Sequence, residues 1–212
     1  MVDAVSVLGT HFAELVRKHA HELFTRQDAK SFCDRVAVEN PKVVEDLVPK
    51  LLSLGIVQRV LQNLLRERVS VRDGVTILEA LAEAAEVTKN PLLLTEFARQ
   101  AMRRAVIRPF LSPQNEFPAY FLDPQIEQAV ESAVEHGEQN SVLTMKPQPL
   151  REAVSRIQRK LDKTASAAVA ITTSGARHFL RQILEPVLPN LTILSHNEIP
   201  PEVKVLPLGT LE

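Results

Sequence analysis

The sequence predicts an α+β protein that is mostly helical, with an all-helical domain followed by a small α/β domain. In its first half, apolar residues recur every three or four positions, as they do on one face of a helix. In its second half, short apolar and β-branched runs alternate with helical patterns, which is typical of strands joined by helices. A polar segment at 111–115 separates the two patterns. We therefore expect a helical domain over 25–112 and an α/β domain over 113–212, preceded by a single helix over 1–24.

The clearest pattern lies in residues 45–86, which predict a helical hairpin. In its first arm, apolar residues fall one, three and four positions apart, and polar residues take the opposite face. The second arm repeats this period after a short polar joint, where Ser70 and Asp73 resemble a capping box. The apolar positions of the two arms are Ile56, Val57, Val60, Leu61, Leu64, Leu65, Val75, Leu78, Leu81, Ala82 and Ala85.

Four further helices are predicted around this hairpin, at 3–24, 26–39, 41–47 and 91–108. Thr25 and Asp28 form the start signal of the second of them. The last two each begin with a proline after an asparagine, which is favourable because the first helical N–H would have no partner anyway. The helix at 91–108 carries a seam of small residues suited to close packing, formed by Leu94, Ala98, Ala101 and Ala105.

Two groups of charged residues in the helical domain are candidate contact surfaces between copies of the chain. Arginines crowd the outer half of the 91–108 helix, and glutamates follow the outer face of the hairpin's second arm. The simpler interpretation is that both faces are merely solvated, because exposed ion pairs contribute little. The alternative is that the basic face of one copy meets the acidic face of the next. The candidate residues are Arg99, Arg103, Arg104 and Arg108, and Glu79, Glu83 and Glu86.

The α/β domain is predicted to alternate strands with helices. Asp123 and Pro124 should begin a helix that reaches about His136, and a loop should follow at 137–140. A second helix is expected at 149–161, and a third begins at Ser174. The strands are predicted at 117–122, 167–172, 191–194 and 203–206.

Composition argues against several classes of function. The formal net charge is −1 and aromatic residues make up 4% of the chain, so neither a phosphate-binding field nor a base-stacking surface for nucleic acid is expected. No apolar run approaches the roughly 20 residues that span a bilayer. Cys33 has no partner cysteine, and His19 and His21 point in different directions on a helix, so we expect no disulfide, metal or cofactor.

Thr172–Gly175, between a predicted strand and a predicted helix, is the only stretch that resembles a ligand site. The free N–H groups of the helix start could hold an anion there, with Arg177 or His178 nearby. The stretch lacks the glycines and the lysine of a nucleotide-binding loop, and it lacks the first glycine of a nucleophile elbow. An ordinary helix cap is therefore the favoured interpretation, and we expect no catalytic residues. A small-ligand-binding or hydrolytic α/β domain remains the alternative function.

Three stretches of the chain resemble the export-gate family of flagellar and virulence type III secretion systems, the FlhA/InvA-like proteins. The run EDLVPKLLSLGIVQRVLQNLLRERVSVRDGVTILEALAEAA is similar to the signature region of that family. The segment THFAELVRKHAHELFTRQDAKSFCDRV at 10–36 resembles the part that precedes it, and LPNLTILSHNEIP at 188–200 continues the likeness. LVPKLLSLGIVQRVLQNLL favours the flagellar branch.

The resemblance implies a non-enzymatic platform that forms a ring of identical copies and docks export chaperones and their substrates. It implies that the full-length protein is anchored in the bacterial inner membrane, with this part at the cytoplasmic face beside other proteins of the secretion apparatus. Helix 1–24 would close a preceding subdomain, so its apolar face would be bare in this chain. The family's chaperone groove lies largely in subdomains that precede this part, so no chaperone-binding residue is assigned here.

Overall fold

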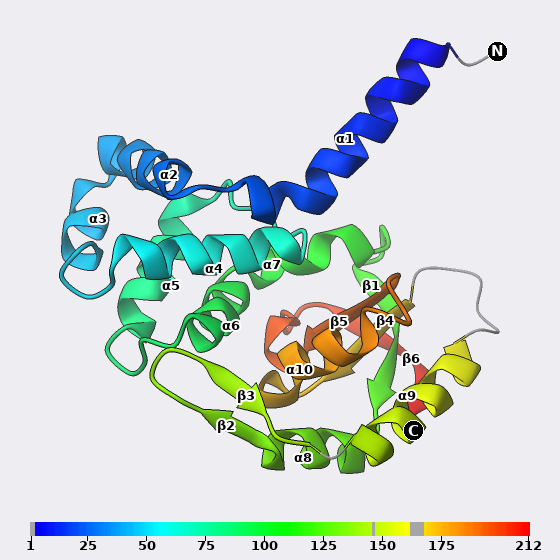
Figure 1. Ribbon diagram of the computed structural model, residues 1–212. Helices are drawn as coiled ribbons and strands as arrows, with labels where there is room; N and C mark the ends of the chain where they lie inside the picture. The colour runs from blue at the N-terminus through cyan, green and yellow to red at the C-terminus, as the bar shows by residue number, and fades with distance from the viewer. Residues whose placement is uncertain (1–2, 146, 162–167) are drawn as a thin grey trace. The chain divides into compact units, whose positions relative to one another are not determined.

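The computed structural model describes residues 3–145, 147–161 and 168–212, and the chain divides into two compact units. The first comprises Met1–Val106 with Glu138–Asn140, and the second comprises Ile107–Gly137 with Ser141–Glu212. Helices form the first unit, and a parallel sheet with helices forms the second (Figure 1). The predicted class, a mostly helical α+β protein with its α/β part at the end, is confirmed.

The helices of the first unit surround an apolar core. Its largest fully buried side chains come from the loop after α3, from α4 and α5, and from α6; they include Leu52, Leu61, Leu64, Ile77, Leu81 and Leu94. The helices are α1 (Ala4–Leu23), α2 (Arg26–Glu39), α3 (Pro41–Leu47), α4 (Leu54–Arg66), α5 (Gly74–Ala84) and α6 (Pro91–Ala101), and α7 (Arg103–Ile107) follows them. The predicted helical hairpin therefore corresponds to α4 and α5.

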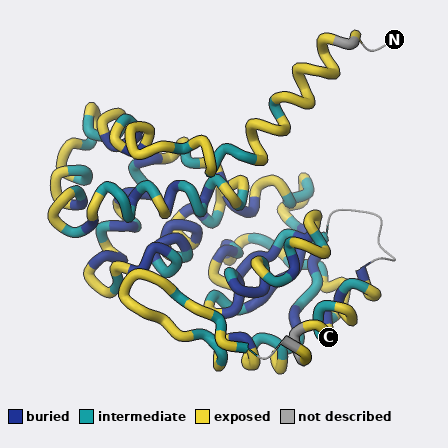
Figure 2. Tube along the Cα trace, viewed as in Figure 1, coloured by how far each residue is buried: buried dark blue, intermediate teal, exposed yellow. Residues whose placement is uncertain are grey.

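Helix α1 extends away from the other helices of its unit and exposes much of its apolar face (Figures 1 and 2). Val5, Leu8 and Phe12 are each more than two-thirds exposed, whereas the later part of the helix contacts α4. The bare apolar face implied by the family resemblance is thus present in this chain.

The helix starts follow the capping signals of the sequence, with one correction. The Thr25 hydroxyl accepts from Asp28 N at 3.2 Å, and the Asp28 carboxylate accepts from Thr25 N at 2.8 Å, which completes the predicted capping box. Helix α5 begins after Asp73, whose carboxylate accepts from Thr76 N at 3.2 Å. The predicted start at Ser70 is wrong, because the Ser70 hydroxyl instead accepts from Arg72 N within the preceding loop.

At the start of helix α5, the backbone of Gly74 lies directly against side chains of α2. A methyl group at Gly74 would lie 2.6 Å from Val36 Cγ2 and 3.1 Å from Phe32 Cζ, too close for either side chain. We expect Gly74→Ala to lower the free energy of unfolding by about 1–3 kcal/mol, as overpacking of a filled core does. Chemical unfolding followed by circular dichroism measures this change. Gly9→Ala on exposed α1, where a methyl group meets nothing within 4 Å, is the matched control and should be neutral or stabilising.

The second unit is built on a parallel sheet with strand order β5-β4-β1-β6. Tyr120 of β1 pairs with Ala170 of β4, which in turn pairs with Ile193 of β5, and a bulge interrupts the β1–β6 pairing between Ala119 and Tyr120. Strands β4 and β5 are buried at nearly every position, whereas most residues of β6 are exposed or half-buried. The strands are β1 (Glu116–Leu122), β4 (Ala168–Thr172), β5 (Leu191–Ser195) and β6 (Lys204–Leu211), and the helices are α8 (Pro124–Ser132), α9 (Pro147–Leu161) and α10 (Ser174–Leu184).

Two features of the second unit differ from the sequence prediction. The helix expected to reach His136 ends at Ser132, and a short antiparallel hairpin follows it, formed by β2 (Val134–His136) and β3 (Ser141–Leu143). Single-turn helices also occur at Arg108–Phe110 and His196–Glu198. The other strands and helices form close to their predicted positions, although Ala167, predicted to begin a strand, lies outside the described residues.

The polar segment 111–115 is a hydrogen-bonded turn. Ser112 N donates to Glu116 O at 2.8 Å, and Asn115 Nδ2 donates to Glu202 O at 2.9 Å. Asn115 also takes a left-handed backbone conformation, with φ of 61°. The Ser112 bond closes the turn before β1, and the Asn115 bond ties the turn to the residues that precede β6. That 25–112 and 113–212 fold as separate domains stays a proposal.

Candidate functional site

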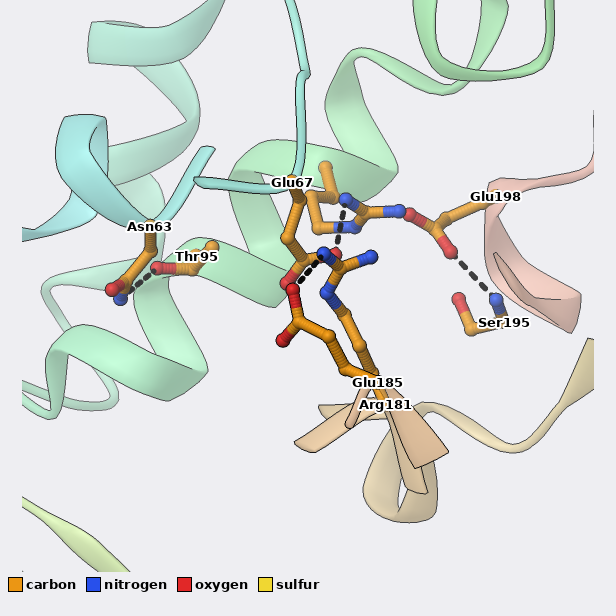
Figure 3. A network of polar contacts seen from close by, with 8 residues as sticks. Asn63, Glu67, Thr95, Arg181, Glu185, Ser195 and Glu198 are labelled. Atoms are coloured by element: carbon orange, nitrogen blue, oxygen red, sulfur yellow. Dashed lines mark hydrogen bonds and ion pairs between the residues drawn. The ribbon is translucent and has the colours of Figure 1, made fainter. Parts of the chain in front are cut away.

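Arg99 does not belong to the predicted basic face, because its side chain is buried. Its guanidinium forms an ion pair with Glu67 at 2.9 Å, and the two side chains are only 3% and 6% exposed. One helical turn earlier on both helices, Asn63 Nδ2 donates to Thr95 Oγ1 at 3.0 Å (Figure 3). Asn63 on α4 thus pairs with Thr95 on α6, and Glu67, the cap of α4, pairs with Arg99 on α6. Arg99 belongs to a polar seam between two helices and not to an exposed contact surface.

The polar face of α4 is likewise covered by its own unit. The side-chain amides of Gln58 and Gln62 both donate to the backbone oxygen of Phe24, at 3.3 and 2.9 Å. Together with Asn63 and Glu67, they hold α4 to neighbouring segments, and on this face Arg59 and Arg66 remain exposed. Most of the polar face of α4 is therefore engaged within its own unit.

The 91–108 helix is not continuous, and the break determines which arginines are accessible. Helix α6 ends at Ala101, with Met102 as its cap, and α7 starts at Arg103. Ala101 and Ala105 of the predicted small-residue seam are exposed instead of packed. Arg103 is half-buried, whereas Arg104 and Arg108 are exposed. We call Arg104 and Arg108, together with Arg103, which precedes them in the sequence, the basic patch.

The acidic residues lie where the sequence predicted. Glu79 and Glu83 are exposed on α5, and Glu86 is exposed in the turn that follows it. We call these three residues the acidic ridge. Val87, next to Glu86, is 82% exposed, which leaves an apolar side chain in contact with solvent beside the ridge.

Sequence reasoning missed an exposed aromatic side chain on α6, the helix that precedes the basic patch in the sequence. Phe97 on α6 is 43% exposed, and Arg104 follows it seven residues later, after the helix break. Aromatic and arginine side chains are enriched in protein interfaces and often dominate their binding energy. The signal in the sequence was the position of Phe97 outside the Leu94–Ala98 seam.

The turn before α10 is already filled by carboxylates of the same unit. Thr173 N donates to Glu127 Oε1 at 3.2 Å, and the Thr173 hydroxyl donates to Glu131, both residues of α8. A methyl group at Gly175 would lie 2.8 Å from Glu131 Oε1, so that carboxylate sits against the helix start. An incoming anion would meet two negative charges there. Arg177, proposed as its partner, is completely buried.

The described residues give little support for a metal site or a reactive thiol. Nowhere among them do three His, Cys, Asp or Glu side chains come together in the manner of a metal site. Cys33 is buried, and desolvation raises the pKa of its thiol, which favours the unreactive protonated form. In the described part of the chain, no helix is both long and apolar enough to cross a membrane.

Comparison with known proteins identifies relatives over the whole chain. Residues 1–204 match the FHIPEP family. The flagellar biosynthesis protein FlhA of Bacillus subtilis is 32% identical over 215 residues, covering 100% of this chain and 32% of the relative. FlhA of Proteus mirabilis is 37% identical over 202 residues, covering 94% and 28%. The chain thus spans about a third of the length of the relatives it matches.

Several solved structures share the fold of this chain. CdsV of Chlamydia pneumoniae, in a complex with CdsO, superimposes with a TM-score of 0.91 at 25% identity, covering 100% of this chain and 63% of that one. The C-terminal domain of InvA gives 0.83 at 26% identity, with coverage of 98% and 64%. Nonameric SctV-C of EPEC gives 0.85 at 23% identity, covering 94% and 60%, a likeness of fold alone. On the family match and these likenesses together, the chain belongs to the FHIPEP family.

Proposed function

We propose that this chain is part of the export gate of a flagellar type III secretion apparatus and acts there as a non-enzymatic docking platform. The observation that carries the proposal is the similarity to FlhA proteins along the entire chain. The flagellar branch is favoured because these relatives are 32% and 37% identical, whereas CdsV and InvA are 25% and 26% identical. In the longer protein, this part would lie at the cytoplasmic face of the inner membrane, and export chaperones, their substrates and other apparatus proteins would be its partners.

Copies of the chain would contact one another through two different groups of exposed charged residues. A head-to-tail interface needs two complementary patches, and the acidic ridge and the basic patch provide them. The exposed side chains of Val87, next to Glu86, and of Phe97, on α6, would add apolar surface to these contacts. SctV-C of EPEC, which shares the fold, is nonameric, and this supports a ring as the product of such contacts.

Removal of this segment from the full-length protein tests the function. In the flagellated bacterium that carries the gene, we expect deletion of residues 1–212 of this chain to abolish export of hook and filament proteins into the medium. Immunoblots of the medium measure export, and blots of the inner-membrane fraction verify that the shortened protein is still made. Normal flagellar export with loss of virulence-factor export would assign the chain to the other branch, and normal export of both would contradict the proposal.

A further inference from the structure

The second unit contains a cavity of about 330 Å³ at one edge of its sheet. Asp123, directly after β1, and Glu212, directly after β6, both line it, so it opens at the carboxyl ends of two neighbouring parallel strands. Ligands of α/β proteins bind preferentially at such ends. Its other walls come from α8, α9 and the segment between them.

The cavity is lined by both apolar and charged residues. The apolar lining residues are Ile126, Ala129, Val130, Met145 and Ala153. The charged lining residues are Asp123, Glu212 and Arg156. Neither Arg156 nor Glu212 forms an ion pair with another residue in the described part of the chain. The side-chain charges of Arg156 and Glu212 are therefore available to a ligand, whereas Asp123 also accepts a hydrogen bond from Gln125 N at 2.6 Å as the cap of α8. Carboxylates outnumber cations among the lining residues.

We propose that this cavity is a docking site for a peptide segment of a partner protein, in which an apolar side chain stands next to a lysine or arginine. The apolar side chain would lie against the apolar lining residues, where Met145 is a flexible, polarizable contact. The basic side chain would lie between the carboxylates of Asp123 and Glu212, as their charge complements it. A cavity of this volume is at the small end of ligand sites, which suits one anchoring side chain and not a whole helix. The site does not depend on contacts between copies of the chain.

Capped dipeptides of matched shape test the chemistry of the site. In two-dimensional amide NMR spectra of the 212-residue chain, Ac-Leu-Lys-NH2 should shift the resonances of 123–130 and 153–157 in a saturable manner. Ac-Leu-Gln-NH2 should bind about two- to fivefold more weakly, the size of effect expected for one exposed charge, and Ac-Leu-Glu-NH2 more weakly still. Equal shifts with all three peptides, or shifts scattered over the chain, would overturn the proposal.

Variants locate the site and identify its charges. Asp123→Asn combined with Glu212→Gln should remove the preference for lysine and preserve the start of α8, because asparagine caps a helix as well as aspartate does. Ala129→Phe should fill the cavity and abolish binding of all three peptides, whereas Gln128→Phe, next to it but outside the cavity lining, should not. Tighter binding of Ac-Leu-Glu-NH2 than of the lysine peptide would show that Arg156 governs recognition and that the assignment of the ligand is wrong.

Discussion

Replacement of Arg99 by alanine should lower the free energy of unfolding by about 3–5 kcal/mol, because it removes the guanidinium that pairs with the buried Glu67 carboxylate. The ion pair is 2.9 Å long and both side chains are almost fully buried. The neighbouring Asn63–Thr95 hydrogen bond holds the same two helices together and should weaken as well. Loss of one partner should destabilise the protein more than loss of both, since an unpaired buried charge carries a large desolvation penalty.

Urea unfolding followed by circular dichroism measures the effect. Glu67→Ala should destabilise to a similar extent, and the double variant Arg99→Met with Glu67→Leu should recover most of the loss, because paired apolar side chains can replace a buried ion pair. Arg59→Ala on the exposed side of α4 serves as the control and should change stability by less than about 0.5 kcal/mol. If Arg99→Ala were as stable as that control, the pair would be open to solvent and the polar seam would not hold α4 to α6.

Most of the helical unit could be predicted from the sequence because its helices carry strong local signals. The apolar period of α4 and α5 and the proline-marked starts of α3 and α6 all act within a few residues of one another. The polar seam could not be predicted in this way. Periodicity identifies the apolar face of α4, but whether solvent or α6 covers its polar face depends on the tertiary arrangement. Arg99 therefore appeared to be one of several exposed arginines.

In the second unit, the prediction failed where elements are short. Strands β2 and β3 have three residues each, too few to show the alternation of a strand against a background of helical spacing. The helix was therefore extended through Val134 to His136. The four strands of the parallel sheet were recognised because their runs are longer and rich in branched residues.

Only part of the candidate contact surface was accessible to sequence reasoning. The acidic ridge follows from the helical period of α5, and its three glutamates are exposed. The break between α6 and α7 was not predicted, because neither a proline nor a glycine marks it. The cavity could not be predicted from the sequence, because its walls come from residues as far apart in the chain as Asp123 and Glu212.

Reversal of the exposed charges of the basic patch should abolish export by the full-length protein if copies meet through it. Arg104 and Arg108 are both exposed, so Arg104→Glu with Arg108→Glu should leave the 212-residue chain folded, which circular dichroism verifies. The reversed face would then repel the acidic ridge of the next copy. Because such contacts are exposed and screened by salt, the isolated chain should be monomeric at physiological ionic strength, and anchoring of many copies should drive assembly.

A charge exchange distinguishes a true contact from a general effect of charge. Adding Glu83→Arg and Glu86→Arg to the reversed protein should restore export, since every copy then carries both complementary faces with their signs exchanged. A double reversal elsewhere, Arg35→Glu with Arg59→Glu on α2 and α4, changes the net charge equally and should export normally. Secretion assays on the full-length variants provide the readout. Normal export by the Arg104 and Arg108 variant, or failure of the exchange to rescue a well-folded protein, would mean that the basic patch is only solvated.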